Sequence, residues 1–294
     1  MREYIGRFAP SPSGPLHLGS LAAALASYLQ ARTHRGRWLL RIEDIDPPRE
    51  PLGAAAAILA CLQAHRLHHD GPVSYQSQHH AHYDAALQQL RTAGRLYACN
   101  CTRAMLKEAA QRSGRNAYRG TCRDAQLPEP GHALRLRLLE NCHHAFIDAA
   151  MGSQQEDLNR SCGDFVLRRR DGLYAYQLAV VVDDGLQGVT EVVRGADLLD
   201  NTARQIHLQQ ALGYRQPSYL HIPLLLDQDK RKLSKQNHAP ALVLSRALEN
   251  LESTWRALKQ DPLPKQSSCE SFLALAATHW NPNKLSTGGA KASK

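Results

Sequence analysis

The loop at residues 9–20, APSPSGPLHLGS, follows a strand-like segment and leads into a helix rich in Ala and Leu. It presents His17 and Gly19 where the predicted helix begins. A helix N-terminus favours an anion, because its N–H groups are free and its dipole end is positive. Gly14, Gly19 and Ser20 imitate the spacing of a P-loop, but the lysine of that motif is absent. The loop is therefore either a phosphate-binding element or a turn with a structural histidine.

A second candidate phosphate-binding element is the segment DKRKLSKQN at residues 229–237, which has four cations between Lys230 and Lys235. It follows the apolar run 219–227, as the first loop follows the first strand. In a parallel sheet both elements lie at the carboxyl edge, where ligands of α/β folds bind. A charge run that is simply solvated is the alternative. Together the two elements can grip a triphosphate from two sides, as transfer at phosphorus requires.

Cysteines form a third group with spacing that suits chemistry. Cys99 and Cys101 are separated by one residue, and Cys122 follows about twenty residues later, which is a spacing that can close a metal site. Three thiolates need a fourth ligand, and no His lies within 97–127. Buried free thiols are the alternative. Ordinary core or surface roles are expected for the remaining cysteines and for a histidine-rich stretch, namely Cys61, Cys142, Cys162, Cys269, His65, His68, His69, His79, His80 and His82.

These groups require a scaffold, and the pattern of elements indicates an α/β fold. A strand at 2–8, a helix at 20–32 and a strand at 37–46 form a βαβ unit, which implies a parallel sheet. Residues 164–184 are expected to form strands joined by a hairpin turn at Asp171 and Gly172. Further helices are predicted at 51–67, 82–97 and 201–214, further strands at 133–138 and 219–227, then two more helices and a frayed end.

Composition limits the function classes. The 294 residues, 43% of them apolar, suit one large domain with a real core. The chain has no run of the roughly 20 apolar residues that span a membrane and begins without a signal-peptide core, so we expect a cytoplasmic protein without a membrane partner. Seven cysteines in that setting favour thiols over disulfides. The net charge of +9 is compatible with a nucleic-acid partner.

Four ordered motifs carry a resemblance to a known family. PLHLGS and KLSKQ resemble the HIGH and KMSKS signatures of class I aminoacyl-tRNA synthetases, and RFAPSPSGPLHLGS, LLRIEDID and VVRGADLLDNTARQ resemble the glutamyl branch. The resemblance extends from about Arg7 to Asn237. Ser20 stands where the first signature ends in His, a position at which the glutamyl branch tolerates small residues.

The resemblance implies that glutamate is activated as its adenylate. The carboxylate attacks the α-phosphate of ATP, pyrophosphate leaves, and His17 and Lys235 act as the catalytic residues. The implied glutamate site comprises Arg7, Phe8, Ala9, Pro10, Ser11, Glu43, Tyr176 and Arg194. The implied ATP site comprises His17, Gly19, Ser20, Lys232, Ser234 and Lys235, with Mg²⁺ accompanying the nucleotide.

Charge counting agrees with glutamate as the amino acid. Arg7 and Arg194 can each form a bidentate pair with a carboxylate, and Glu43 can pair with an α-ammonium group. Ser11 and Tyr176 can add hydroxyl hydrogen bonds. Two cations and one anion match the two carboxylates and the one ammonium group of glutamate. For any single Arg, a surface salt bridge is the alternative.

The resemblance also completes the cysteine site and divides the chain. It implies one structural Zn²⁺ per chain, held by Cys99, Cys101, Tyr118 and Cys122. The expected fold is a Rossmann-like catalytic domain, 1–96 and 128–237 with an acceptor-side insertion, carrying a small zinc-binding insert at 97–127. Residues 238–294 are expected to form a short helical C-terminal region with a frayed tail.

Residues 238–294 are too few for the helical anticodon-binding region of a full glutamyl-tRNA synthetase. The chain therefore resembles the glutamyl-Q tRNA(Asp) synthetase family, which implies glutamate transfer to the queuosine base at the wobble position of tRNA(Asp). The partners implied are ATP, L-glutamate and queuosine-containing tRNA(Asp), and we expect a monomer. The alternatives are a truncated enzyme that charges tRNA(Glu) and a non-catalytic RNA-binding paralogue.

Overall fold

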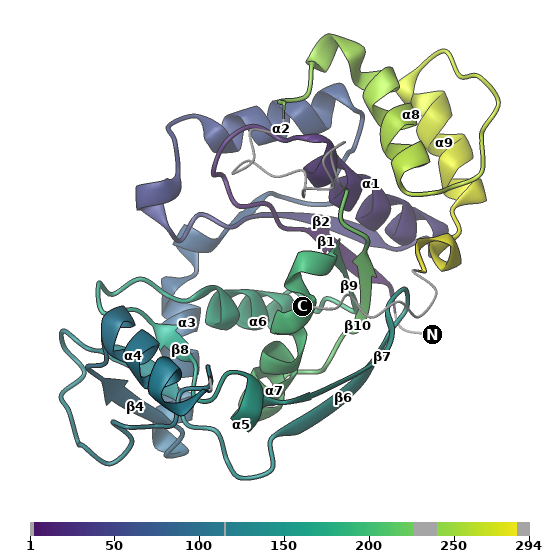
Figure 1. The fold of residues 1–294 in the computed structure, drawn as a ribbon. Helices are drawn as coiled ribbons and strands as arrows, with labels where there is room; N and C mark the ends of the chain where they lie inside the picture. The colour runs from purple at the N-terminus through teal and green to yellow at the C-terminus, as the bar shows by residue number, and fades with distance from the viewer. Residues whose placement is uncertain (1–2, 115, 226–239, 287–294) are drawn as a thin grey trace.

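The computed structural model describes residues 3–114, 116–225 and 240–286 (Figure 1). The described helices are α1 (Leu18–Thr33), α2 (Ala54–Ala64), α3 (His80–Thr92), α4 (Arg103–Ser113), α5 (Leu158–Ser161), α6 (Tyr176–Leu186), α7 (Thr202–Leu212), α8 (Ala247–Ala257) and α9 (Cys269–His279). The described strands are β1 (Ile5–Phe8), β2 (Arg37–Ile42), β3 (Ser74–Tyr75), β4 (Leu96–Cys99), β5 (Ala133–Leu136), β6 (His143–Asp148), β7 (Gly152–Asp157), β8 (Val166–Arg168), β9 (Glu191–Gly195) and β10 (Ser218–Ile222).

The predicted parallel strand pairing is present, divided between a sheet of β1, β2 and β3 and a sheet of β7, β6, β10 and β9. Strand β2 pairs in parallel with both β1 and β3, and the α1 crossover between β1 and β2 completes the predicted βαβ unit. Strand β10 pairs in parallel with β9 and β6, and β7 is the antiparallel edge strand. The backbone N–H of Thr190, just before β9, donates to the carbonyl of Ile5 at 2.8 Å. The two groups of strands therefore meet at β1 and β9.

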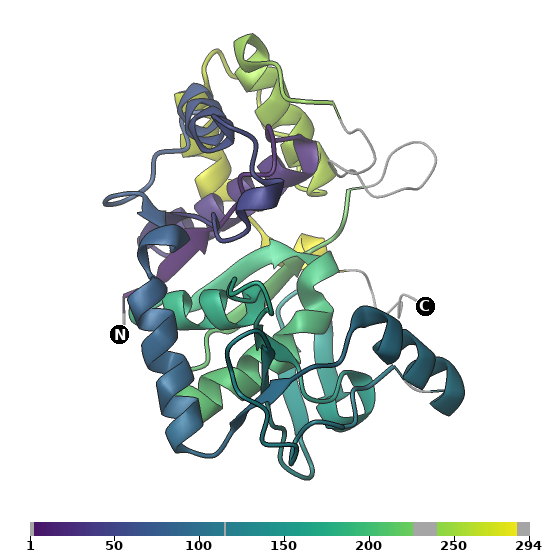
Figure 2. The same cartoon turned by 90° about the vertical axis from the view of Figure 1, so that its left-hand side faces the viewer.

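Two main cores flank this junction. One core contains α1 with β1, β2, α2, α8 and α9, and the other contains α3, β4, β5, α6 and α7. Both views show α1 (purple) and α9 (yellow) side by side, although the two helices lie far apart in the sequence (Figures 1 and 2). Trp280 Nε1 donates to Gln30 Oε1 at 2.7 Å, which fastens the later helices to α1. No helix among the described residues has the length and apolar character needed to cross a membrane.

The prediction of strands throughout 164–184 is wrong for its second half. The turn is present, since Arg169 N–H donates to the Leu173 carbonyl at 2.7 Å and Gly172 has φ 87°. After the turn the chain enters α6 instead of a strand. Residues 177–184 are buried on every side of the helix, so the sequence shows a continuous apolar run whose period does not distinguish a buried helix from a buried strand.

The region around 97–127 is tied into a third, antiparallel sheet. Strand β4 pairs with β5, and β5 pairs with β8. Helix α4 follows β4, with Thr102 as its N-cap. Sequence analysis did not identify this helix or the β6–β7 hairpin. The predicted division into 1–96 with 128–237, 97–127 and 238–294 remains a prediction.

Candidate active site

The loop after β1 positions the first group of predicted site residues. Gly14 has φ 135°, a conformation that other residues rarely adopt. His17 is the N-cap of α1, and its Nδ1 accepts the N–H of Ser20 at 3.3 Å. Since Nδ1 is an acceptor, a neutral His17 ring carries its proton on Nε2. The imidazole is therefore set up as a donor beside the positive end of a 16-residue helix.

Lys232, Ser234 and Lys235 lie outside the described residues. The chain resumes against the first loop, where Leu242 N–H donates to the Leu16 carbonyl at 3.1 Å and Ala241 forms a β-bridge with His17. Residues 241 and 242 therefore lie beside the loop that carries His17.

A cavity of about 340 Å³ brings together most of the residues predicted to hold glutamate. Pro10 is absent from its lining, but the Pro10 carbonyl accepts the Glu43 N–H at 3.0 Å and so positions that residue. Many of the residues that line the cavity come from β1, β9 and the start of α6. The lining residues are Arg7, Phe8, Ala9, Ser11, Ala23, Glu43, Arg49, Tyr176, Val193, Arg194, Gly195 and Leu198.

Arg194, on β9, forms one wall of this cavity and is bound by neutral groups. Its Nε donates to His221 Nε2 at 3.0 Å, and its terminal nitrogens donate to Gln205 Oε1 at 2.7 Å and Thr202 Oγ1 at 2.9 Å. Longer contacts reach Tyr176 Oη and the Leu198 carbonyl. Among the described residues, no carboxylate lies within 4.0 Å of its guanidinium nitrogens. We call Arg194 and its neutral partners the Arg194 side.

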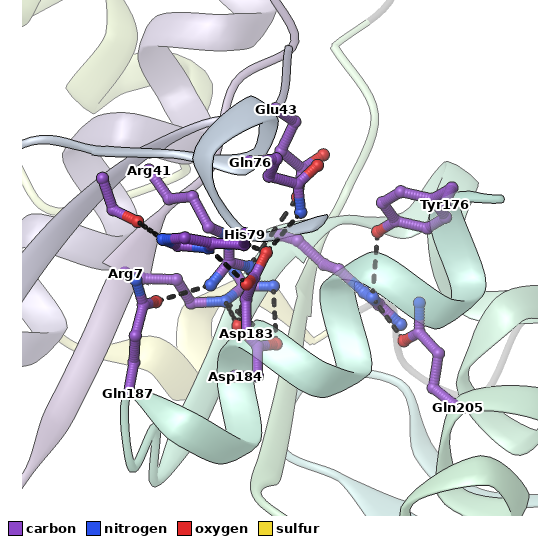
Figure 3. Close-up of polar contacts among 12 residues, drawn as sticks. Arg7, Arg41, Glu43, Gln76, His79, Tyr176, Asp183, Asp184, Gln187 and Gln205 are labelled. Atoms are coloured by element: carbon purple, nitrogen blue, oxygen red, sulfur yellow. Dashed lines mark hydrogen bonds and ion pairs between the residues drawn. The ribbon is translucent and has the colours of Figure 1, made fainter. Parts of the chain in front are cut away.

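An ion-pair network, which we call the paired side, reaches the same cavity. It consists of Arg7, Arg41, Glu43, Asp183 and Asp184 (Figure 3), of which Arg7 and Glu43 line the cavity. Arg7 Nε lies 3.2 Å from Asp184 Oδ1, and an Arg41 terminal nitrogen lies 2.7 Å from the same oxygen. All five side chains are less than a tenth exposed. Although burial opposes ionisation, the Arg7 and Arg41 guanidiniums lower the pKa of Asp184. The two cations of the paired side are therefore largely neutralised within the protein.

Glu43 follows β2 and has a strongly shifted pKa. Burial raises the pKa of its carboxyl to about 7, and the Arg41 and Arg7 cations only partly offset this effect. The nearest cationic nitrogen belongs to Arg41, at 3.7 Å. A bound ammonium group would favour the ionised form of Glu43. Glu43 can therefore accept a hydrogen bond from a ligand amino group, and the charge of its carboxyl depends on whether that ligand is bound.

The cysteine cluster also forms in the structure. The sulfur atoms of Cys99, Cys101 and Cys122 lie within 4.8 Å of one another. The Tyr118 hydroxyl lies 3.4 Å from the Cys99 sulfur and 3.6 Å from the Cys101 sulfur, and the Arg135 guanidinium lies over its ring at 4.0 Å. Burial opposes ionisation of Cys99, but hydrogen bonding from Tyr118 contributes to lowering its pKa to about 7. Three clustered thiols with a ready thiolate form a donor set that can bind a metal ion.

Comparisons with known proteins agree with this geometry. A family described as "tRNA synthetases class I (E and Q), catalytic domain" matches residues 5–255. The chain belongs to this family.

Named relatives of the synthetase cover almost the whole chain. A glutamyl-Q tRNA(Asp) synthetase from Pseudomonas putida is 50% identical over 285 residues, which are 96% of this chain and 93% of the relative. One from Pectobacterium atrosepticum is 51% identical over 284 residues, with 96% and 86% covered. A crystal structure of a glutamate tRNA ligase from Elizabethkingia meningosepticum in complex with its amino acid matches with a TM-score of 0.81 at 24% identity, covering 99% of this chain and 67% of that one. The expected class I synthetase fold is confirmed.

Sequence analysis missed several residues that build the synthetase site. Arg41 lies two residues before Glu43, so their side chains share one face of the strand. Asp183 and Asp184 end an apolar run, where unpaired carboxylates would be costly. His79, expected to be ordinary, contacts Asp183 Oδ1 through Nδ1 at 2.7 Å. These spacings could have been recognised in the sequence. The incorrect strand prediction for 176–184, however, replaced the buried helix on which Asp183 and Asp184 lie.

A larger cavity of about 700 Å³ adjoins the first and offers space for a second substrate of the synthetase. Both cavities are lined by Ser11, Glu43, Arg49 and Tyr176, so a group in either lies next to the other. Sequence analysis did not single out Arg49. The remaining lining residues of the larger cavity are Ser13, Ile45, Asp46, Glu50, Gln76, Arg169, Tyr174 and Ala175.

Proposed function

We propose that this enzyme activates L-glutamate with ATP and transfers it to the queuosine base at the wobble position of tRNA(Asp). The relatives named above carry that function in their names, at about half identity over nearly the whole chain. The observation that carries the proposal from the structure is Arg194. A buried guanidinium held only by neutral partners retains its charge for a ligand carboxylate, and it faces the same cavity as Glu43.

In this proposal, different side chains of the cavity bind different parts of glutamate. A carboxylate binds Arg194, with Tyr176 beside it, and the ammonium group binds Glu43 as Glu43 loses its proton. Arg7, Phe8, Ala9 and Ser11 also line the cavity, while Pro10 acts through the backbone. Arg7 lines the cavity, but its Nε is held by Asp184. We therefore assign Arg7 a smaller share of ligand binding than charge counting from the sequence implies.

ATP binds where the first loop meets α1. His17, with its Nε2 proton, and the helix N-terminus beside Gly19 and Ser20 stabilise the phosphates. We assign Lys232, Ser234 and Lys235 to the same phosphates on the sequence motif alone, and Mg²⁺ accompanies the nucleotide. A glutamate carboxylate oxygen bonds to the α-phosphorus as the bond to pyrophosphate breaks. In the transfer step AMP leaves the acyl group, which passes to queuosine.

The metal that fits the cysteine cluster is one structural Zn²⁺, held by Cys99, Cys101, Cys122 and Tyr118. Thiolates are preferred zinc ligands, and the four candidate ligand atoms already converge. Cys101→Ser should abolish stoichiometric zinc and lower the protease resistance of 97–127. Elemental analysis of the purified protein and limited proteolysis measure both effects, with Cys269→Ser as the control. Wild-type protein without zinc would contradict the assignment.

The reaction partners are ATP, glutamate and tRNA, and because tRNA is the acceptor we place the enzyme in the cytoplasm. We propose a monomer as the working unit. Gel filtration at assay concentrations tests this, and loss of activity on dilution would indicate a required oligomer.

The decisive experiment supplies ATP and labelled glutamate with three RNAs in parallel. These are tRNA(Asp) with queuosine, tRNA(Asp) lacking queuosine, and tRNA(Glu). We expect label only on the first, and removal of the 3′-terminal CCA nucleotides should not prevent labelling, because the acceptor is a base in the anticodon. Label on tRNA(Glu) alone would favour the truncated charging enzyme. Absence of both label and glutamate-dependent pyrophosphate exchange would favour a non-catalytic paralogue.

A further inference from the structure

His221 and Asp148 form a fully buried pair behind Arg194 that none of the roles above includes. His221 lies on β10 directly opposite Arg194 on β9 in the parallel register. Its Nε2 accepts from Arg194 Nε at 3.0 Å, and its Nδ1 lies 2.6 Å from Asp148 Oδ2. Neither the His221 nor the Asp148 side chain is exposed to solvent. The three side chains form a line from β6 through β10 to the cavity wall.

The protonation state of His221 follows from its two partners. A guanidinium can only donate, so His221 Nε2 must be an unprotonated acceptor, and the ring proton lies on Nδ1, where it is donated to Asp148. Burial lowers the pKa of His221, as do the Arg194 and Arg7 charges, while Asp148 opposes the shift. The ring is therefore neutral, and its tautomer is set by Asp148.

A neutral acceptor at this point has a different consequence from a carboxylate. Arg7 and Arg41 are held by Asp184, which fixes them but also neutralises them. His221 instead fixes the orientation of Arg194 and leaves its charge unneutralised. We propose that the Asp148–His221 pair is a positioning device that holds Arg194 as a free cation for a carboxylate of the amino-acid substrate. This inference rests on the proposed function, because it assigns that carboxylate to glutamate.

Substitutions at His221 separate the two properties, orientation and neutrality. His221→Gln retains a neutral acceptor, whereas His221→Glu places a carboxylate against Arg194. Glutamate-dependent ATP–pyrophosphate exchange on the full chain measures KM for glutamate, KM for ATP and kcat separately. We expect H221E to raise KM for glutamate by about 10- to 100-fold, as for loss of a hydrogen bond to a charged group. H221Q should recover most of that loss, and KM for ATP should stay within about threefold in both.

The chain offers a matched control. His207 is also a buried histidine whose Nε2 contacts an arginine, with Arg95 at 2.8 Å, but it lines neither cavity. His207→Gln and His207→Glu should leave KM for glutamate unchanged. Circular dichroism checks folding, and if H221E does not fold, His221→Leu takes its place, since it removes the acceptor without adding charge.

The outcomes are distinct. An unchanged KM for glutamate in folded H221E or H221L, or an equal rise in H221Q and H221E, would overturn the positioning role. A rise in KM for ATP of the same size would also overturn it, because the effect would then be general. Wild-type protein without glutamate-dependent exchange would instead refute the proposed function on which the inference rests.

Discussion

The paired side and the Arg194 side, which meet at the small cavity, hold their arginines in opposite ways. On the paired side, Arg7 and Arg41 contact carboxylates at 2.7–3.2 Å and are neutralised inside the protein. On the Arg194 side, the guanidinium is bound by His221, Thr202 and Gln205, which leave its charge intact. The difference suggests that the paired side stabilises the fold around the cavity, whereas the Arg194 side attracts the ligand.

The largest effect should follow from breaking the paired side. Asp184→Ala leaves two buried guanidiniums without their shared partner, and the free energy of unfolding should fall by about 3–5 kcal/mol. Urea denaturation measures the loss. Asp124, paired with Arg137 through a side chain that is 90% exposed, provides the control, and Asp124→Ala should cost less than about 1 kcal/mol. An equal loss of unfolding free energy in the two variants would contradict a structural role for the paired side.

The Arg194 side should respond in binding more than in stability. Arg194→Ala should weaken glutamate binding by about 100-fold, because a desolvated charge-assisted contact is lost. Arg194→Lys retains the charge but not the fork, so it should fall between the wild type and the Ala variant. Isothermal titration with glutamate measures both. Unchanged affinity in Arg194→Ala would show that the ligand carboxylate binds elsewhere.

A third test uses pH, since only the paired side has a group that titrates near neutrality. The pKa of Glu43 is raised to about 7, so most Glu43 carboxyls are protonated below that pH. Each must lose its proton before it can bind the ammonium group of glutamate. The dissociation constant for glutamate should rise by about tenfold per pH unit below 7. Glu43→Gln should bind more weakly but with a flatter profile. A steep profile that persists in Glu43→Gln would assign the titration to another group.

The stability consequence of the same shift has a defined sign. Folded Glu43 binds its proton more tightly than the unfolded chain does, since its pKa is raised from 4.5 to about 7. Its contribution to stability is therefore present below about pH 4.5 and is lost as pH rises to about 7. Urea midpoints of wild type and Glu43→Gln across this range should diverge in that direction.

The smallest effect should come from Tyr176→Phe. Its hydroxyl accepts from Arg194 at 3.4 Å, the longest contact to a side chain on the Arg194 side. Loss of one such hydrogen bond should weaken glutamate binding by about threefold, with little change in unfolding. The same titration measures it. A loss as large as that of Arg194→Ala would mean that the hydroxyl contacts the ligand directly.

Much of the site could be predicted because the relevant residues lie in short ordered motifs. Arg7, Glu43, Tyr176 and Arg194 were predicted to share a pocket, and the structure brings them to one cavity. The cysteines and Tyr118 also converge as predicted. The contacts that determine how each arginine is used were not predicted. Arg7 meets Asp184 across 177 positions of the sequence, a separation at which no local spacing indicates a contact.

The sequence by itself determined which chemistry the chain carries. The Pro- and Gly-rich loop before α1, the spaced cysteines and the order of the motifs depend on local backbone preferences and residue types, which sequence patterns record directly. The tertiary structure alone decided how charge is distributed around the cavity. Whether the charge of Arg7 or Arg194 is neutralised depends on which side chains of distant strands and helices pack against it. Burial strengthens each such interaction, because the local dielectric constant is low. His221 shows this most clearly, because an apolar strand with one histidine does not reveal that its ring holds an arginine.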